Sequence, residues 1–286
     1  MRKIEIILLF AFICQLFYCQ VESFDSLIIK VYDSNVNKYK LINVLNSEII
    51  ASKDFIGAVK CFENNIYYVS QDYNQPGISC LNKKSLIKDQ FKVLKEIRGF
   101  ISDLSVSKED VVMILSEYEY ESYNETEISF LNDKCNLHLK QTKDIVLSII
   151  DLSDTNIIYI SRNETETYIN VFNLKHSENI TIKTVKTKEE IITVYDYSNN
   201  IVLYSLYNVL ENKQRIYEYD ILFKKNKLIE ISVEGTIKSV KRIKKSSYLL
   251  LVDNVLYLSK DKNIKKLYKM QDYYDVINIV TFKIKK

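Results

Sequence analysis

Glycine, proline, cysteine and histidine are scarce in this sequence, and the shortages exclude several classes of protein. With four glycines the chain has no glycine-rich phosphate loop, and with one proline and no sustained helical period it favours strands. Two histidines, His138 and His176, are too few for a histidine-ligated zinc site. Of five cysteines, only Cys61, Cys80 and Cys135 follow the first 23 residues, and three cannot all pair within one chain. We therefore expect neither a disulfide framework nor a cofactor.

The first 23 residues have the layout of a secretory signal peptide. Two basic residues precede an apolar run over residues 6–19. This run is shorter than the ~20 apolar residues that a membrane span needs, and Gln15 interrupts it. We predict cleavage after Ser23, with Cys19 as the alternative, and secretion of residues 24–286 to the extracellular space.

Basic and acidic residues are nearly balanced in number, at 40 and 37. Such a mixed surface does not favour nucleic acid as a partner, and neither does a secretory route. Three acceptor sequons for N-glycosylation begin at Asn124, Asn163 and Asn179. We therefore expect a secreted, monomeric glycoprotein without a membrane span.

One short motif recurs six times along the chain. It consists of Ile or Val, two further residues, a large apolar residue and a short polar residue. It begins at Ile29, Ile78, Ile128, Ile169, Ile216 and Val255. Subtracting neighbouring positions gives spacings of 49, 50, 41, 47 and 39 residues, the size of a propeller blade.

A second, almost continuously apolar motif lies before five of these positions, as is typical of strands covered on both faces. This motif covers residues 65–70, 110–116, 156–161, 200–205 and 247–252. Another strand is predicted before each one, over residues 55–60, 101–106, 147–152, 191–195 and 237–240. Weaker outer strands with alternating charges are predicted over residues 91–96, 137–141, 182–186 and 228–233.

These strands predict an all-β fold, a six-bladed β-propeller that fills residues 24–286 as a single domain. The alternative is a β-sandwich or β-helix with accidental regularity. One blade is predicted to be shared between the N- and C-terminal strands. Residues 27–33 and 39–45 would be its third and fourth strands, and residues 276–282 would be its first strand running into its second.

The signal peptide, the chain length and repeats such as residues 156–161 followed by 169–173 resemble the ommochrome-binding proteins of insect haemolymph. These proteins are secreted propellers. The resemblance implies a six-bladed propeller that holds a small, pigment-like ligand.

Ligands usually bind a propeller on the face where the first strands begin and where the second and third strands are joined. Carboxylates and tyrosines gather in these segments, and tyrosine combines an apolar ring with a polar tip. The candidate ligand-binding residues are Asp54, Phe55, Phe100, Asp103, Tyr118, Tyr120, Glu190, Tyr273 and Tyr274.

Three functions remain open. The first is a non-enzymatic carrier that holds a small hydrophobic or aromatic ligand in the central funnel. The second is a protein-interaction module, such as a secreted effector or a salivary or venom component. The third is a lactonase-like metal-dependent hydrolase, for which Asp103, Asp151, Asp196 and Asn278 could supply ligands. Since these four residues are better explained as turn or strand-end residues, we predict no catalytic residue and no metal site.

Overall fold

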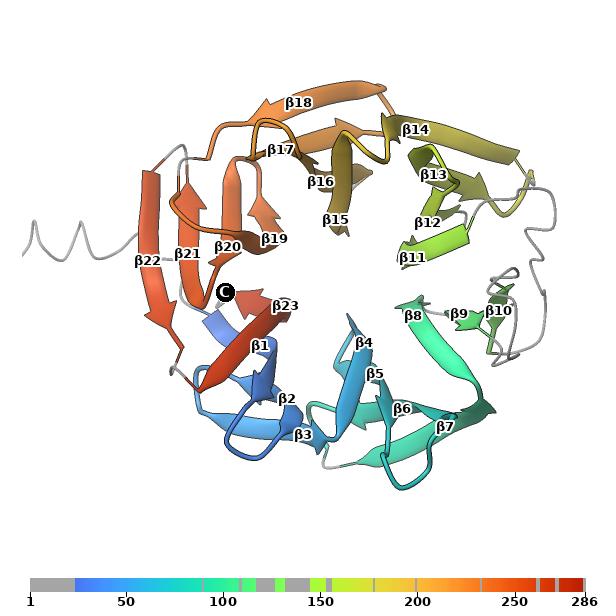
Figure 1. Cartoon of the computed structure of the whole chain (residues 1–286). Helices are drawn as coiled ribbons and strands as arrows, with labels where there is room; N and C mark the ends of the chain where they lie inside the picture. The colour runs from blue at the N-terminus through green and yellow to red at the C-terminus, as the bar shows by residue number, and fades with distance from the viewer. Residues whose placement is uncertain are drawn as a thin grey trace, which may run out of the picture.

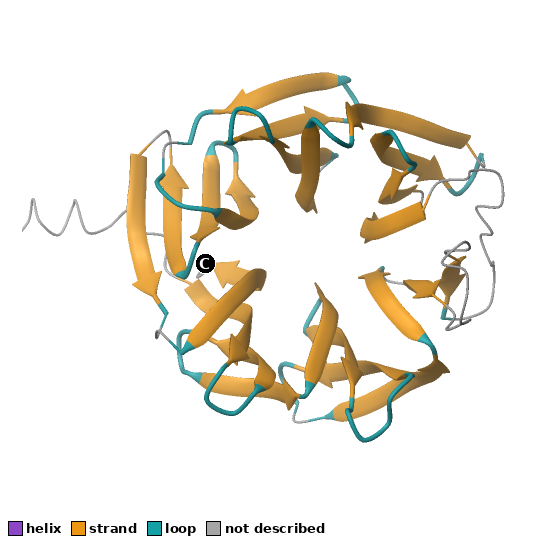
Figure 2. Ribbon diagram, in the orientation of Figure 1, coloured by secondary structure: helices purple, strands orange, loops and turns teal. Residues whose placement is uncertain are grey.

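The computed structural model describes residues 24–284, apart from residues 89, 108–109, 117–126, 132–144, 153–155, 177, 199, 232, 261–262 and 271–272. In the described parts the only regular elements are strands, which lie in six sheets around a ring (Figures 1 and 2). No helix there could cross a membrane. We number the sheets 1 to 6 around the ring.

Each sheet runs from a first strand at the centre to a last strand at the rim (Figure 1). Sheet 1 contains β23 (Tyr274–Ile284), β1 (Phe24–Asp33), β2 (Lys38–Asn43) and β3 (Glu48–Lys53). Sheet 2 contains β4 (Phe55–Phe62), β5 (Asn65–Gln71), β6 (Ile78–Ser85) and β7 (Phe91–Arg98). Sheet 3 contains β8 (Phe100–Val106), β9 (Val111–Ser116) and β10 (Glu127–Phe130).

The other three sheets each have four strands. Sheet 4 contains β11 (Ile145–Leu152), β12 (Asn156–Arg162), β13 (Glu166–Asn173) and β14 (Glu178–Lys186). Sheet 5 contains β15 (Glu190–Ser198), β16 (Ile201–Asn208), β17 (Lys213–Asp220) and β18 (Lys225–Ile229). Sheet 6 contains β19 (Ile237–Lys244), β20 (Ser247–Val252), β21 (Val255–Lys260) and β22 (Asn263–Lys269).

The predicted β-propeller is confirmed. In sheets 2 to 6 each apolar motif forms a second strand, and each strand predicted before it forms a first strand. The outer strand predicted over residues 137–141 lies outside the described residues. The outer strand of sheet 5 begins earlier than predicted, because β18 covers Lys225–Ile229.

The closing sheet corrects one detail of the prediction. The two ends of the chain do share sheet 1, since β1 pairs antiparallel with β23. However, the N-terminal segment supplies the second, third and fourth strands, and the C-terminal segment supplies only the first. In β1, Leu27, Ile28, Ile29 and Val31 are all buried. Such burial is typical of a second strand, which neighbouring sheets cover on both faces. The motif that begins at Ile29 therefore lies in a second strand, whereas the other five copies lie in third strands.

The described core falls into six apolar clusters, one at each junction between neighbouring sheets. The second strands supply much of this core, and β20 is buried along its whole length. Every first strand also contains a β-bulge against its second strand. Bulges increase local twist and redirect side chains, so the first strands present polar groups toward their neighbours at the centre of the ring.

The turns explain how the chain manages with so little glycine. A tight hairpin turn needs a left-handed residue, and Asn and Asp accept this conformation more readily than most other residues do. The described non-glycine residues with positive φ include Asn37 (53°), Asn200 (62°), Asn212 (50°) and Asp253 (49°), each next to a hairpin turn. The other four described residues of this kind are Ser47, Glu63, Lys224 and Ser246, so residues other than glycine supply the left-handed conformation at these turns.

Cys61 and Cys80 are free thiols. Burial raises the pKa of Cys61 to about 12, so this thiol stays protonated and packs as a small apolar group. Cys135 lies outside the described residues.

Candidate functional site

The described segments that are predicted to bind a ligand lie at one end of the ring. We call it the funnel face and define it as the end of the ring where first strands begin and where second and third strands are joined. Hydrogen bonds hold these two kinds of segment together. The backbone N–H of Tyr73 donates to Asp54 Oδ2 (3.3 Å), that of Ser34 to the Tyr273 carbonyl (3.2 Å), and that of Val209 to the Glu189 carbonyl (3.0 Å).

Four aromatic rings form a continuous arc on this face across sheets 1, 2 and 3. Tyr32 and Tyr39 pair across β1 and β2, with ring centroids 5.2 Å apart. Tyr39 meets Phe55 of β4 edge to face at 5.3 Å, and Phe55 lies 6.3 Å from Phe100 of β8. These separations are in the range of favourable aromatic contacts. Tyr39, Phe55 and Phe100 are each partly exposed, so the arc offers apolar surface to a ligand.

Lys30 of β1 lies beside this arc. Its Nζ donates a hydrogen bond to the Gly57 carbonyl (2.7 Å) at the bulge of β4 and lies 5.6 Å from the centre of the Tyr39 ring. Burial lowers the pKa of Lys30 to about 8, although the negative charge of Asp103 opposes this shift. The arc therefore has one amine that changes charge near physiological pH.

A second aromatic pair lies where β23 begins. The rings of Tyr273 and Tyr274 are 4.4 Å apart, and Lys40 Nζ lies 5.8 Å from the centre of the Tyr274 ring. Lys40 also forms an ion pair with buried Asp33 (2.5 Å), and this contact holds the pKa of Asp33 below its usual value. The funnel face thus combines aromatic rings with two lysines.

The sequence-predicted residues are only partly brought together. Phe55 and Phe100 share the arc, and Tyr273 and Tyr274 form the second pair. Asp54 binds the Tyr73 backbone and lies 3.5 Å from Lys38, so it anchors a loop. Glu190 begins β15, in the sheet opposite sheet 2 in the ring (Figure 1), and is therefore remote from the arc. Tyr118 and Tyr120 lie outside the described residues.

Two of the carboxylates considered as metal ligands, Asp103 and Asp196, have structural partners instead. Asp103 accepts hydrogen bonds from the backbone N–H of Leu104 (2.8 Å) and of Ile149 in the next sheet (2.9 Å). Burial raises the pKa of Asp103, against the opposing effects of Lys60 and these two N–H groups. Asp196 accepts from Lys241 Nζ (3.1 Å) and from the Arg242 backbone (3.4 Å). Among the described residues, no three Asp, Glu, His or Cys side chains gather as a metal site.

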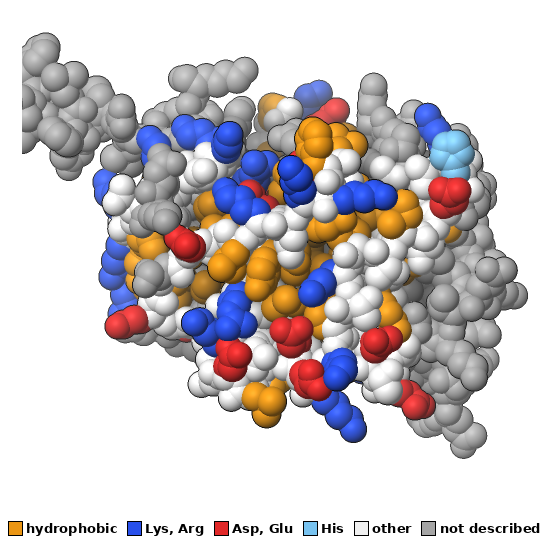
Figure 3. Space-filling view, turned by 90° about the horizontal axis from the view of Figure 1, so that it is seen from above, with side chains coloured by type: hydrophobic (Ala, Val, Ile, Leu, Met, Phe, Trp, Pro, Cys, Tyr) orange, Lys and Arg blue, Asp and Glu red, His pale blue; other side chains and the backbone are white. Residues whose placement is uncertain are grey.

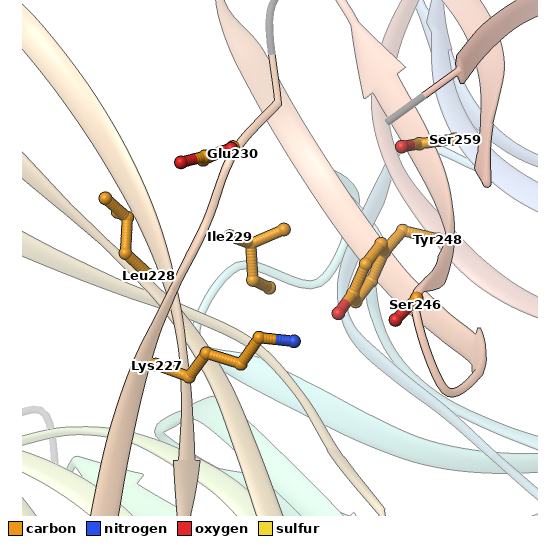
Figure 4. A pocket seen from close by; sticks show the side chains of 7 residues that line it. All are labelled: Lys227, Leu228, Ile229, Glu230, Ser246, Tyr248 and Ser259. Carbon is orange, nitrogen blue, oxygen red and sulfur yellow. The ribbon is translucent and has the colours of Figure 1, made fainter. Parts of the chain in front are cut away.

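A separate pocket of about 470 Å³ lies between sheets 5 and 6, away from the funnel (Figure 4). Lys227, Leu228, Ile229 and Glu230 line it from β18 and the residue that follows. Ser246, Tyr248 and Ser259 line it from sheet 6, and the Lys227 side chain points across toward Tyr248 and Ser246. The pocket is mixed in character, with one amine, one carboxylate and three hydroxyl groups.

Sequence reasoning missed Tyr32, Tyr39, Lys30 and Lys40. A signal was present, because Tyr32 and Tyr39 flank a turn of polar residues and therefore had to meet across a hairpin. The assignment of residues 27–33 as a third strand places the C-terminal end of this segment, with Tyr32, on the face opposite the funnel. Assignment as a second strand would have put Tyr32 on the funnel face.

Two of the three sequon asparagines are described. Asn179 is exposed on the outer strand β14. Asn163 lies between β12 and β13, where its Nδ2 donates to the Tyr168 hydroxyl (2.8 Å) and its Oδ1 accepts from the Glu166 backbone (2.8 Å). Asn124 lies outside the described residues.

Comparisons with known proteins agree with the fold. No protein-family model and no curated protein matches the sequence. The chain of a nidogen/laminin complex is similar in structure with a TM-score of 0.61 and 8% identity, over 89% of this chain and 97% of that chain. TolB from Acinetobacter baumannii is similar with a TM-score of 0.59 and 11% identity, over 89% and 67% of the two chains.

An enzyme is also among the similar structures. An oligogalacturonate lyase from Vibrio parahaemolyticus has a TM-score of 0.53 and 14% identity, over 86% of this chain and 79% of that chain. Because propellers support both binding and catalysis, likenesses at this level of identity bear on the fold alone. The similarity to ommochrome-binding proteins stays a prediction. What these comparisons establish is that the chain is an all-β propeller.

Proposed function

We propose that this protein is a secreted, six-bladed β-propeller that binds a small hydrophobic or aromatic ligand on its funnel face and catalyses no reaction. Residues 1–23 would be removed as a signal peptide, and residues 24–286 would act as a monomeric glycoprotein.

The observation that carries this proposal is the aromatic arc. Tyr39, Phe55 and Phe100 come from three neighbouring sheets, so the ring closure itself brings them together. Partly exposed rings in contact favour a flat, apolar ligand whose own ring packs against the aromatic arc. Lys30, at the edge of the arc, suits a ligand with an acidic or electron-rich group.

The proposal is tested by purifying the protein from its native source and searching for a bound compound by absorption and mass spectrometry. In parallel, the apo protein is titrated with 8-anilinonaphthalene-1-sulfonate, an aromatic anion. Replacing Phe55 and Phe100 together by Leu removes the rings but keeps apolar volume, and we expect about tenfold weaker binding of this probe. Leu210→Ser, on a funnel-face loop far from the arc, is the matched control.

Folding of each variant is checked by its urea unfolding midpoint. Undiminished probe binding by a folded Phe55→Leu, Phe100→Leu variant, or loss of binding in the Leu210→Ser control, would contradict the assignment to the arc.

A second candidate function, binding of an extracellular protein, rests on different residues of the same face. Val36, Tyr73 and Leu210 lie in loops between second and third strands and are 51%, 64% and 86% exposed. Tyrosine is enriched among the residues that contribute most to protein interfaces, so Tyr73 would be the central contact. Capture of a partner that is lost with Tyr73→Ser but kept with the two Phe→Leu changes would favour this function over the first.

A further inference from the structure

The face opposite the funnel has features that ligand binding at the arc does not explain. We call it the base face and define it as the end of the ring where first and second strands, and third and fourth strands, are joined. Some of the most exposed apolar side chains of the molecule lie in its turns. Leu222 and Phe223, between β17 and β18, are 68% and 72% exposed, and Ile87, between β6 and β7, is 71% exposed.

The turn that carries Leu222 and Phe223 is held in place. The Phe223 backbone N–H donates to Asp220 Oδ1 (3.0 Å), and the Ile221 N–H donates to the Asn200 carbonyl of the neighbouring turn (2.9 Å). Two apolar side chains are therefore presented to solvent by an ordered turn. Covering exposed apolar side chains removes them from water, so a partner that buries these two would be held by the hydrophobic effect.

Lysines surround this turn on the base face. Lys224 and Lys225 follow Phe223 directly, and both are exposed. Lys175 occupies the equivalent turn of sheet 4, and Lys244 and Lys245 lie in the first-to-second-strand turn of sheet 6. The nearby carboxylates are fewer. Asp220 is engaged in the turn, and Glu178 at the start of β14 is exposed.

A second apolar turn lies across the ring. Sheets 2 and 5 are opposite each other (Figure 1), so Ile87 is separated from Phe223 by the width of the base face. The Leu86 N–H donates to the Asn64 carbonyl (2.7 Å), as in the sheet 5 turn, and Lys84 and Lys88 flank the apolar pair. Two anchors on opposite sheets spread the contact across the width of the base face, which suits an extended partner surface.

The pocket between sheets 5 and 6 lies beside the same corner. Lys227 follows the Leu222–Phe223 turn on β18, and Ser246 belongs to the lysine-rich turn of sheet 6. Seen along the wall of the ring, hydrophobic side chains gather in the middle of this wall, with both basic and acidic side chains around them (Figure 3). In the pocket, the Lys227 amine and the hydroxyl groups can bind an anionic headgroup, which the Glu230 carboxylate opposes.

We propose that the base face docks onto an anionic lipid membrane. Leu222, Phe223 and Ile87 would enter the headgroup region, while the flanking lysines bind acidic lipids and Lys227 receives a headgroup in the pocket. Apolar insertion together with clustered lysines is the combination that binds peripheral proteins to acidic bilayers. The charges attract the surface, and the apolar tips keep the protein there.

The test uses the purified protein with vesicles of phosphatidylcholine alone and of phosphatidylcholine mixed with phosphatidylserine. We expect co-sedimentation with the acidic vesicles only, weakening as salt screens the lysines. The Leu222→Ser, Phe223→Ser double variant should bind about tenfold more weakly. Lys224→Gln with Lys225→Gln should weaken binding about twentyfold and flatten its salt dependence.

The matched control is again Leu210→Ser, which removes a leucine that is even more exposed (86%) from the funnel-face end of sheet 5 and should bind vesicles normally. Lys227→Gln should weaken binding to acidic vesicles without changing the unfolding midpoint. The proposal is overturned if acidic vesicles are not bound, if the two apolar substitutions leave binding unchanged, or if a soluble acidic polymer is bound in place of vesicles. None of these outcomes affects ligand binding at the arc.

Discussion

The junction of sheets 1 and 2 and the junction of sheets 5 and 6 have similar apolar centres. They differ in how their charged side chains are paired. Both have an apolar centre to which second strands contribute, with Ile28 and Ile66 in one and Leu203 and Leu250 in the other. In the first junction Lys30 meets a backbone carbonyl and a ring, and the ion pair of Lys38 with Asp54 (3.5 Å) lies nearer the surface. In the second, cations are matched to carboxylates across the junction.

The paired charges tie sheet 5 to sheet 6. Arg242 Nε lies 2.8 Å from Glu218 Oε1, and Lys241 Nζ lies 3.1 Å from Asp196 Oδ1. Burial, with the nearby charge of Glu218, raises the pKa of Tyr248, so this hydroxyl stays protonated beside the ion pair. Among the described residues, no carboxylate forms an ion pair with Lys30, which senses Asp103 only at longer range and lies at the edge of the aromatic arc. The matched buried charges hold neighbouring sheets together, whereas the less well matched amine of Lys30 lies at the surface that we propose binds a ligand.

Breaking the Glu218–Arg242 pair should have the largest effect on stability. The side chains of Arg242 and Glu218 are only 16% and 10% exposed. Glu218→Ala leaves the guanidinium buried without its carboxylate, and we expect a loss of about 3 kcal/mol in the free energy of unfolding, measured in urea. Replacing both residues, as Glu218→Leu with Arg242→Met, should recover most of the lost free energy of unfolding. A double variant as unstable as Glu218→Ala would show that packing rather than charge holds this junction.

The unmatched lysine predicts a smaller, pH-dependent effect. The pKa of Lys30 is about 8 in the folded protein and near 10.5 in the unfolded chain, so between these values the unfolded chain binds more protons. The stability of the protein relative to Lys30→Met should therefore rise as pH increases from about 8 to 10.5, by on the order of 1–2 kcal/mol. Urea unfolding across this range measures it, and a difference independent of pH would contradict the lowered pKa.

An exposed ion pair should matter least. Arg215 and Glu211 lie 2.6 Å apart with side chains 36% and 51% exposed. Glu211→Gln should change the unfolding free energy by less than about 0.5 kcal/mol, because water and salt screen the attraction. The same urea unfolding assay measures this change. A loss of stability as large as that of Glu218→Ala would show that burial does not explain the difference between the two ion pairs.

The propeller could be predicted because its second strands are covered on both faces and therefore read as apolar runs, as in Asn156–Arg162 and Ser247–Val252. Outer strands carry less information. β3 and β22 were not predicted, since their burial patterns are mostly exposed or partly buried and resemble those of polar loops. Burial, rather than strand propensity, is what the sequence records most clearly.

The candidate site was harder to predict, because it depends on which end of each strand faces the funnel. If β1 is assigned as a third strand instead of a second strand, its direction in the sheet is reversed and Tyr32 is placed on the base face. Phe55 and Phe100 begin first strands, whose direction was assigned correctly, and these two residues were found. The cation at the arc could not be foreseen, since Lys30 approaches Gly57 only through the packing of two sheets.

Closure through β1 and β23 has a practical consequence for how the protein can be handled. Phe24 pairs with Ile284, so the first and last strands meet at the base face and both ends of the chain leave the ring side by side. A tag or fused domain at either end would stand next to the lysine-rich turns and leave the funnel open. Fusions are therefore suited to capturing the protein for ligand screening, whereas vesicle experiments call for the untagged chain.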